Sequence, residues 1–181
     1  MLTDLPIGWF SLSDIEFYRD QYYKISENGW ALEIGSFCGR SLCSVADIIL
    51  ERKINVIAVD TFQDLEICFA DETPWICRDS KKQFVDNITR FGIDKQVLIF
   101  QGDSKVILKK YPNWCFNFIF IDGDHSESAV KEDIINSLPL TVRGGVIAGH
   151  DVLDWKSVNR AVKGMFNHIV NIKDNIFWLE F

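Results

Sequence analysis

The sequence lacks features that mark several classes of protein. It has no long apolar run, and Met1 is soon followed by Asp4 and Pro6, so we expect neither a secretion signal nor a membrane span. It has no surplus of positive charge, because 26 acidic residues outnumber 19 lysines and arginines and give a net charge of -7. This balance disfavours a partner that is bound through many phosphates. We therefore expect no nucleic-acid partner, no membrane partner and a cytoplasmic location.

The sequence also lacks paired cysteines. No two of its five cysteines show the C-x-x-C spacing of a zinc or redox site, and their number is odd. We expect reduced, mostly buried thiols, including Cys38, which has no histidine near it in the sequence to activate it as a nucleophile. Internal repeats and low-complexity segments are absent, and residues 1–181 fit the size of a single domain.

The stretch from Trp30 to Ser41 is the centre of the predicted fold. Ala31–Ile34 is an apolar run that predicts a buried strand, and Gly35 and Gly39 precede apolar residues at helical spacing. The glycines remove bulk where the chain turns and a ligand touches the backbone, and the amides of a helix start favour an anionic group. Phe37 stands where the dinucleotide fingerprint needs its second glycine, which disfavours NAD. The alternative is a turn whose glycines only shape the backbone.

Strands and helices alternate along the rest of the chain. Capping boxes at Ser13 and Ser80 predict two helix starts, and the first 29 residues are expected to supply a helix, closed by Asn28-Gly29, and a cover for the site. The predicted strands are Ala31–Ile34, Ile54–Val59, Val97–Phe100, Phe116–Ile121 and Val146–Ala148, the last preceded by a turn at Arg143–Gly145, with a terminal hairpin of Ile169–Ile172 and Ile176–Phe181. This alternation predicts an α/β fold, with a doubly wound, mainly parallel seven-stranded sheet that ends in an antiparallel hairpin.

Acidic residues end the successive predicted strands: Glu33, Asp60, Asp103, Asp122 and Asp151. The carboxyl ends of parallel strands meet at the edge where such sheets bind ligands, so we expect these residues to surround one site. Asp60 ends the second strand, where nucleotide-binding α/β folds hold a ribose diol, since two hydroxyl donors suit one carboxylate. The alternative for Asp60 is a solvated aspartate that begins a loop.

The segment from Phe62 to Asp79 shows no clean period and contains Pro74 and several acids, which predicts a long loop. It follows Asp60 directly and carries the aromatic residues Phe62, Phe69 and Trp75, so we interpret it as a mobile lid over the acceptor site. The alternative is a static loop whose aromatic side chains complete the core.

Five motifs in order resemble the class I S-adenosylmethionine-dependent methyltransferases, from about Trp30 to the end of the chain. They are Leu32–Ser41, Val59-Asp60, Gly102-Asp103-Ser104, Ile121-Asp122-Gly123-Asp124-His125 and Gly144–Asp151. Within that superfamily, the Asp-Gly-Asp-His and Gly-His-Asp motifs are similar to the small branch near the macrocin-type sugar O-methyltransferases and, more distantly, to the catechol-type enzymes. The resemblance implies a Rossmann-like methyltransferase fold.

The resemblance implies S-adenosylmethionine as the cofactor. The glycine loop would pack against its methionine part, Asp60 would take the ribose hydroxyls, and Asp103 and Ser104 would flank adenine. The full set of cofactor-binding residues that it implies is Glu33, Gly35, Ser36, Gly39, Ser41, Asp60, Thr61, Asp103, Ser104, Asp122 and His125. A sulfonium carries positive charge, so a strand edge rich in carboxylates independently suits this cofactor better than it suits a pyrophosphate.

Two routes remain open for removing the proton of an alcohol acceptor. In the metal-dependent relatives the positions that match Asp122, His150 and Asp151 hold magnesium, which would make Mg²⁺ or Mn²⁺ a second cofactor, although imidazole departs from the hard oxygen ligands that magnesium prefers. Without a metal, Asp124 or His125 would be the general base. The alternatives are a helix cap for Asp124, a loop-ordering or cofactor contact for His125, and either a catalytic or a structural role for His150. His168 is expected to be structural.

The sequence thus predicts O-methylation of a small-molecule or sugar hydroxyl, with the sugar or glycan acceptor argued by analogy. Two other classes stay open: a Rossmann-type NAD-binding oxidoreductase, and a protein that binds the cofactor without catalysis. A homodimer is left open beside a monomer.

Overall fold

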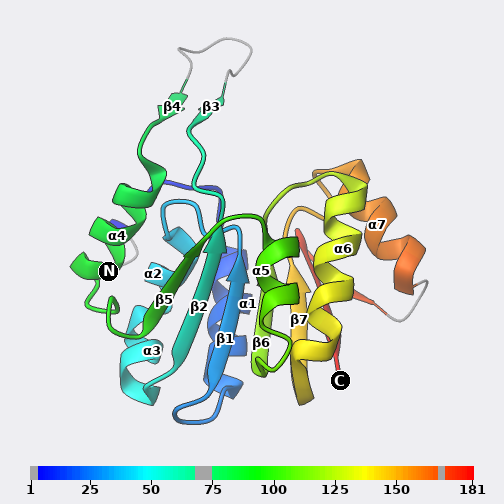
Figure 1. The fold of residues 1–181 in the computed structure, drawn as a ribbon, viewed down its shortest axis with the longest axis horizontal. Helices are drawn as coiled ribbons and strands as arrows, with labels where there is room; N and C mark the ends of the chain where they lie inside the picture. Colours follow the sequence, from blue (N-terminus) through cyan, green and yellow to red (C-terminus); the bar gives the residue numbers. More distant parts are fainter. Residues whose placement is uncertain (1–3, 68–74, 167–169) are drawn as a thin grey trace.

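The computed structural model describes residues 4–67, 75–166 and 170–181. Within them one sheet is built from β1 (Trp30–Ile34), β2 (Asn55–Asp60), β5 (Val97–Gln101), β6 (Phe116–Ile121), β7 (Thr141–Gly149), β8 (Asn171–Lys173) and β9 (Ile176–Glu180). Its seven strands lie in the order β5-β2-β1-β6-β7-β9-β8 (Figure 1). The pairs from β5 to β7 are parallel, and β9 is antiparallel to both β7 and β8. The predicted fold class is therefore confirmed.

Helices cover both faces of the sheet (Figure 1). One face packs against α1 (Leu12–Lys24), α2 (Arg40–Ser44), α3 (Ala46–Arg52) and α4 (Ser80–Arg90), and the other against α5 (Ser104–Lys110), α6 (Glu127–Ser137) and α7 (Lys156–Phe166). Alternate residues of β6 serve the two cores, because successive side chains of a strand point to opposite faces. Phe118 and Phe120 join the first core, and Ile119 and Ile121 join the second. Each such buried side chain stabilises the fold by about 1.5–3 kcal/mol.

The predicted capping boxes are wrong in position. The first helix begins after Ser11, whose hydroxyl accepts from Asp14 N at 3.2 Å while Asp14 Oδ2 accepts from Ser11 N at 2.8 Å. Ser11 and Ser13 both start a Ser-x-x-acid pattern, so the pattern alone could not choose between them. The helix ends at Lys24, before the predicted Asn28-Gly29 stop. Ser80 lies inside the first turn of α4, whose N-cap is Asp79 without a side-chain cap.

Two other local predictions are corrected. The helix predicted after the glycine turn is interrupted at Val45 and forms α2 and α3. The predicted turn at Arg143–Gly145 lies inside β7, where the pairing with β6 shifts register. Gly144 has φ +80°, and a side chain on Gly145 would meet Thr141 Cγ2 at 2.8 Å, so this irregularity needs both glycines.

The segment predicted as a long loop contains a two-stranded antiparallel hairpin, β3 (Leu65–Ile67) and β4 (Trp75–Cys77), which projects beyond the carboxyl edge of the main sheet (Figure 1). Phe69 and Pro74 lie outside the described residues, as do His168 and the first residue of the predicted Ile169–Ile172 strand. In the part of the chain that is described, no helix combines the length and the apolar character needed to cross a membrane.

Candidate active site

A cleft of about 1400 Å³ opens along the carboxyl edge of the sheet. Each of the five parallel strands of the sheet contributes a residue to the cleft lining at or just after its carboxyl end. These residues are Gly35 after β1, Asp60 at β2, Gly102 after β5, Asp122 after β6 and His150 after β7. The acidic strand ends that the sequence predicted to meet thus surround one cavity, apart from Glu33, which lies behind it.

The N-terminal segment forms one wall of this cleft. Gly8, Trp9, Phe10 and Ser11 line it. Arg40, at the start of α2, donates from Nη1 to the carbonyl oxygen of Pro6 at 2.8 Å and from Nε to that of Phe10 at 3.0 Å. The guanidinium therefore fastens the segment beside the glycine loop.

The first glycine of the glycine loop is required by contacts within the protein. A side chain on Gly35, which has φ +86°, would overlap the backbone carbonyl of Asp122. The ends of β1 and β6 approach each other here, and Asp122 N donates to Ile34 O at 2.7 Å. Neighbouring backbone, rather than a ligand, thus excludes a side chain at this position. Gly39 has φ +81° at the start of α2 and packs near Phe84, outside the cleft lining.

Glu33 lies behind the glycine loop with 1% of its surface exposed. Its Oε1 accepts hydrogen bonds from the hydroxyls of Tyr18, at 3.0 Å, and Ser41. Burial raises the pKa of Glu33 to about 7, because the charged form is poorly solvated there. Ser36 and Ser41 line the cleft, so Glu33 reaches it only through these neighbours.

Asp60 is held by two backbone amides at the edge of the cleft. Its Oδ2 accepts from Phe37 N at 2.8 Å and its Oδ1 from Phe62 N at 2.6 Å. Each carboxylate oxygen keeps a further lone pair for a ligand hydroxyl. Phe62 is 8% exposed and packs against Phe84 with ring centroids 5.4 Å apart. Phe62 is therefore a core residue and does not supply the lid contact area that the sequence analysis assigned to it.

Asp103 and Ser104 lie at the end of β5, but other contacts occupy their side chains. Asp103 Oδ1 caps α5 by accepting from Lys105 N at 2.8 Å. The hydroxyl of Ser104 donates to Asp133 Oδ1. Asp133, on α6, lines the cleft and was not predicted. In the sequence, Asp133 could be noticed only as an acidic residue at the edge of the apolar helix stripe that contains Val130.

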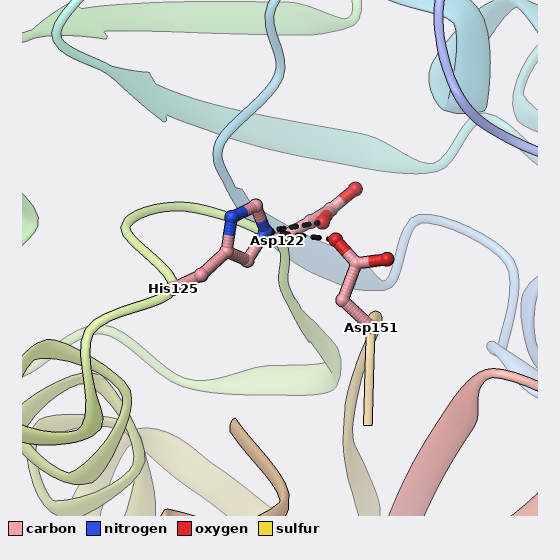
Figure 2. A group of neighbouring side chains, drawn as sticks. All are labelled: Asp122, His125 and Asp151. Atoms are coloured by element: carbon pink, nitrogen blue, oxygen red, sulfur yellow. Dashed lines mark ion pairs between the residues drawn. The ribbon is translucent and has the colours of Figure 1, made fainter. Parts of the chain in front are cut away.

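Asp122, His125 and Asp151 converge at the ends of β6 and β7 (Figure 2). His125 Nε2 lies 2.8 Å from Asp151 Oδ2 and 3.7 Å from Asp122 Oδ1. The imidazole stacks on the indole of Trp155, with ring centroids 4.8 Å apart and an interplanar angle of 17°. Burial lowers the pKa of His125, but the two carboxylates outweigh burial and raise it to about 9.

His150 lies deeper, between two acids. Its Nε2 is 3.2 Å from Asp14 Oδ2 and its Nδ1 is 3.1 Å from Asp151 Oδ1. Burial lowers the pKa of His150, but Asp14 and Asp151 outweigh it and raise the value to about 10. Burial raises the pKa of Asp151, while the two histidines more than offset it and hold this pKa well below its usual range. The site is thus a chain of alternating charges, from Asp14 on α1 to Asp122.

Comparison with known proteins identifies the fold family. A family model described as a methyltransferase domain matches residues 32–152. The chain belongs to this family. No curated protein matches it.

Solved structures share the whole fold of this methyltransferase. Cofactor-bound Rv0187 from MTB superposes with a TM-score of 0.73 at 19% identity, covering 97% of this chain and 82% of that one. TomG from Streptomyces achromogenes, an O-methyltransferase in complex with SAM, gives 0.68 at 18% identity, covering 97% and 82%. CalS11, a TDP-rhamnose 3'-O-methyltransferase, gives 0.65 at 13% identity, covering 99% and 89%.

The methyltransferase presents one group of three side chains, among its described residues, that suits a divalent cation. The ligand atoms of Asp122, His125 and Asp151 lie within 4.8 Å of one another. The sequence analysis placed His150 in this set, but its imidazole is 5% exposed and lies between Asp14 and Asp151. Two carboxylates and one imidazole fit Mn²⁺ better than Mg²⁺, which prefers oxygen ligands and water.

Asp124 has the geometry of a turn residue in this methyltransferase. It is exposed, and its Oδ1 accepts from Ser126 N at 2.8 Å, while the Ser126 hydroxyl caps α6. The helix-cap alternative for Asp124 is therefore corrected: Ser126 is the N-cap of α6, and Asp124 accepts from its backbone amide in the turn before the helix. Thr61 lines the cleft from an exposed position next to Asp60.

Proposed function

We propose that this methyltransferase transfers the methyl group of S-adenosylmethionine to a hydroxyl of a small-molecule or sugar acceptor. The observation that carries the proposal is the order of groups along the cleft. Ser104 follows β5, Asp60 ends the neighbouring strand β2, and the cluster of Asp122, His125 and Asp151 lies at the ends of β6 and β7, on the other side of β1. TomG, bound to SAM, and the sugar methyltransferase CalS11 share the fold, which supports the cofactor and the acceptor class.

The cleft suits the charge of this cofactor. When bound, S-adenosylmethionine supplies a methyl group on a positively charged sulfur. Among the described residues, nine aspartates line the cleft against one arginine and one lysine. Asp60 offers free lone pairs to a ribose diol, and Asp122 offers negative charge beside the glycine loop.

For the route without a metal, His125 is the residue that we assign to removing the acceptor proton. Its position between Asp122 and Asp151 keeps it protonated near neutral pH in the ligand-free protein, since its pKa is about 9. Positive charge that enters the site repels the imidazolium and lowers this pKa. His125 thus becomes a base once the site is loaded, and the stacking on Trp155 holds its ring in place.

The surroundings of the acceptor side favour a neutral or cationic molecule. Trp9 and Trp155 line the cleft with about half of their surfaces exposed, at 51% and 50%, and offer flat apolar faces of the kind on which a sugar ring packs. Arg40 and Lys105 are engaged elsewhere, Arg40 with backbone carbonyls and Lys105 with Glu132 at 3.4 Å. The two histidines of the lining lie against Asp14, Asp122 and Asp151. An anionic acceptor would therefore meet uncompensated carboxylates.

Replacing Asp60 tests the cofactor assignment. We expect Asp60→Ala to weaken the binding of S-adenosylhomocysteine by about 10- to 100-fold, because a charged acceptor for two hydroxyls is worth about 1.5–3 kcal/mol. Isothermal titration calorimetry measures the loss. Asp64→Asn is the matched control, since Asp64 lines the same cleft and accepts from Asp79 N at 3.0 Å. Unchanged affinity in folded Asp60→Ala would remove the ribose assignment.

Two measurements on the wild-type protein distinguish the proposed function from its two rivals. Thermal stabilisation by NADH and not by S-adenosylhomocysteine would indicate an oxidoreductase. Binding of the cofactor without release of S-adenosylhomocysteine across neutral, cationic and anionic hydroxyl acceptors would indicate a non-catalytic binding protein.

We also propose that the β3–β4 hairpin, within residues 62–79, acts as a lid, with Phe62 anchored in the core. Gln63, Asp64 and Leu65 line the cleft at the base of the β3–β4 hairpin, which Figure 1 shows extending away from the main sheet. A lid of this kind orders when the site fills and excludes water. We expect the amides of β3 and β4 to exchange rapidly in the ligand-free protein and to slow on addition of cofactor and acceptor, as measured by hydrogen exchange. Protection that is already high without ligand would make the hairpin a fixed scaffold.

A further inference from the structure

Two free thiols meet where the glycine loop touches the base of the β3–β4 hairpin. Cys38 belongs to the glycine loop, and Cys77 is the last residue of β4. Their sulfur atoms lie 3.7 Å apart, although the two residues are 39 positions apart in the chain. Cys38 is 0% exposed and Cys77 is 1% exposed. Sulfur atoms that are already in contact need only a small movement of either residue to reach bonding distance.

Helix α4 holds both cysteines in this arrangement. The Gln83 side-chain amide lies between the two sulfurs, with Nε2 3.4 Å from Cys77 Sγ and Oε1 3.7 Å from Cys38 Sγ. The same Nε2 donates to the carbonyl oxygen of Arg78 at 2.9 Å, which fixes the orientation of the amide. Asn87 Nδ2 donates to the carbonyl oxygen of Cys38 at 2.9 Å. The thiols are therefore kept face to face by contacts from one helix.

We propose that Cys38 and Cys77 form an oxidation site, at which hydrogen peroxide converts the two thiols into a disulfide between the glycine loop and the hairpin. One thiolate attacks a peroxide oxygen, so an S–O bond forms, the O–O bond breaks and a sulfenic acid and water result. The second thiolate attacks the sulfur of the sulfenic acid, so the S–S bond forms and the S–O bond breaks. In total the two thiols lose two electrons and two protons, and the peroxide is reduced to two waters.

Opening at the base of the hairpin controls the access of peroxide to the pair. Burial raises the pKa of the Cys38 thiol to about 12, so the reactive thiolate is scarce while the pair is covered. Among the described residues, β3 and β4 pair only with each other, and a two-stranded hairpin is marginally stable by itself. Opening exposes the thiols, and closing returns the oxidised sulfur to its partner. The pair should thus react more slowly than the exposed Cys115.

The disulfide affects the proposed cofactor site through the glycine loop, and this consequence rests on the proposed function. Phe37, the residue before Cys38, donates from its backbone N to Asp60 Oδ2 at 2.8 Å. Movement of Cys38 toward Cys77 displaces this amide, which is one of the two that hold the Asp60 carboxylate. We expect oxidation to weaken the binding of S-adenosylhomocysteine by about 3- to 10-fold, as for the loss of one hydrogen bond.

The experiment uses the full chain with Cys68→Ser and Cys115→Ser, which remove two thiols outside the pair. After treatment with hydrogen peroxide, mass spectrometry of the intact protein should find the loss of two hydrogen atoms. Unreduced digestion should yield one pair of peptides joined through Cys38 and Cys77, and dithiothreitol should reverse both changes. Cys77→Ser should abolish the crosslink. Cys43→Ser removes another buried thiol, on α2, and is the matched control that should leave the crosslink in place.

The outcomes separate the oxidation site from the function of the protein. Absence of a crosslink after peroxide, or a crosslink formed through Cys43, overturns the site whether or not the protein binds the cofactor. Calorimetry with S-adenosylhomocysteine before and after reduction measures the effect on binding. Equal affinities of the crosslinked and reduced proteins overturn the effect on the cofactor site. A crosslink between Cys38 and Cys77 in a protein whose reduced form does not bind S-adenosylhomocysteine overturns the proposed function and supports the oxidation site.

Discussion

Replacing His125 with alanine is expected to lower kcat by about 10²- to 10⁴-fold, the usual contribution of a general base, with little change in the affinity for S-adenosylhomocysteine. The imidazole lies at the convergence of Asp122 and Asp151, whereas Asp60, which we propose binds the ribose, accepts from Phe37 N in the glycine loop. The rate of S-adenosylhomocysteine release gives kcat, and calorimetry gives the affinity. Equal losses of both would make His125 a cofactor contact.

The pH dependence of the activity of the wild-type protein and of His125→Ala adds a second readout. A base must be deprotonated to accept a proton, and the pKa of His125 is about 9 in the ligand-free protein. The value of kcat/KM for the cofactor, which reports the free enzyme, should therefore rise with pH toward about 9 and then level off. The residual activity of His125→Ala should lack this rise. Retained activity in that variant, with a loss in Asp124→Ala, would transfer the base role to Asp124.

The parts of this site that sequence alone predicted share one physical cause. In a parallel α/β sheet the strands end where the apolar runs stop, and all these ends lie at one edge, so the positions of Asp60, Asp122 and Asp151 along the chain suffice to place them there. Their place in the cleft required no knowledge of side-chain packing. The terminal hairpin was predicted from a different signal, two apolar runs separated by Lys173-Asp174-Asn175, and β8 pairs antiparallel with β9.

The missed features depend on contacts that no local pattern encodes. Asp14 reaches His150 only because α1 packs across the sheet and brings its first turn to the end of β7. Asp133 faces the cleft because α5 and α6 lie side by side, which lets Ser104 reach it. Gly35 belongs to a motif typical of a ligand loop, but glycine is required there because the backbone of Asp122 leaves no room for a side chain. Long-range packing decided each of these cases, and a single sequence carries little information on it.

Removal of divalent cations is the second change for which we expect a large effect. If the cluster holds a divalent cation, excess EDTA should abolish turnover, and Mn²⁺ or Mg²⁺ should restore it; the base role of His125 belongs to the route without a metal. A divalent cation, when bound, supplies positive charge that lowers the pKa of an acceptor hydroxyl. Asp122, His125 and Asp151 offer three donor atoms within 4.8 Å of one another (Figure 2), and all three residues line the cleft.

Direct binding of Mn²⁺ tests this site without relying on activity. Calorimetry with Mn²⁺ should show binding to the wild-type protein, and a loss of affinity in Asp122→Asn but not in Asp154→Asn, an aspartate of the same cleft outside the cluster. Affinity should rise with pH, because an imidazole must lose its proton to coordinate and the pKa of His125 is about 9. Full turnover in excess EDTA would contradict the metal. The cluster would then act by proton transfer alone, with Asp122 and Asp151 orienting His125 as the base and His150, held by Asp14, fixing the position of Asp151.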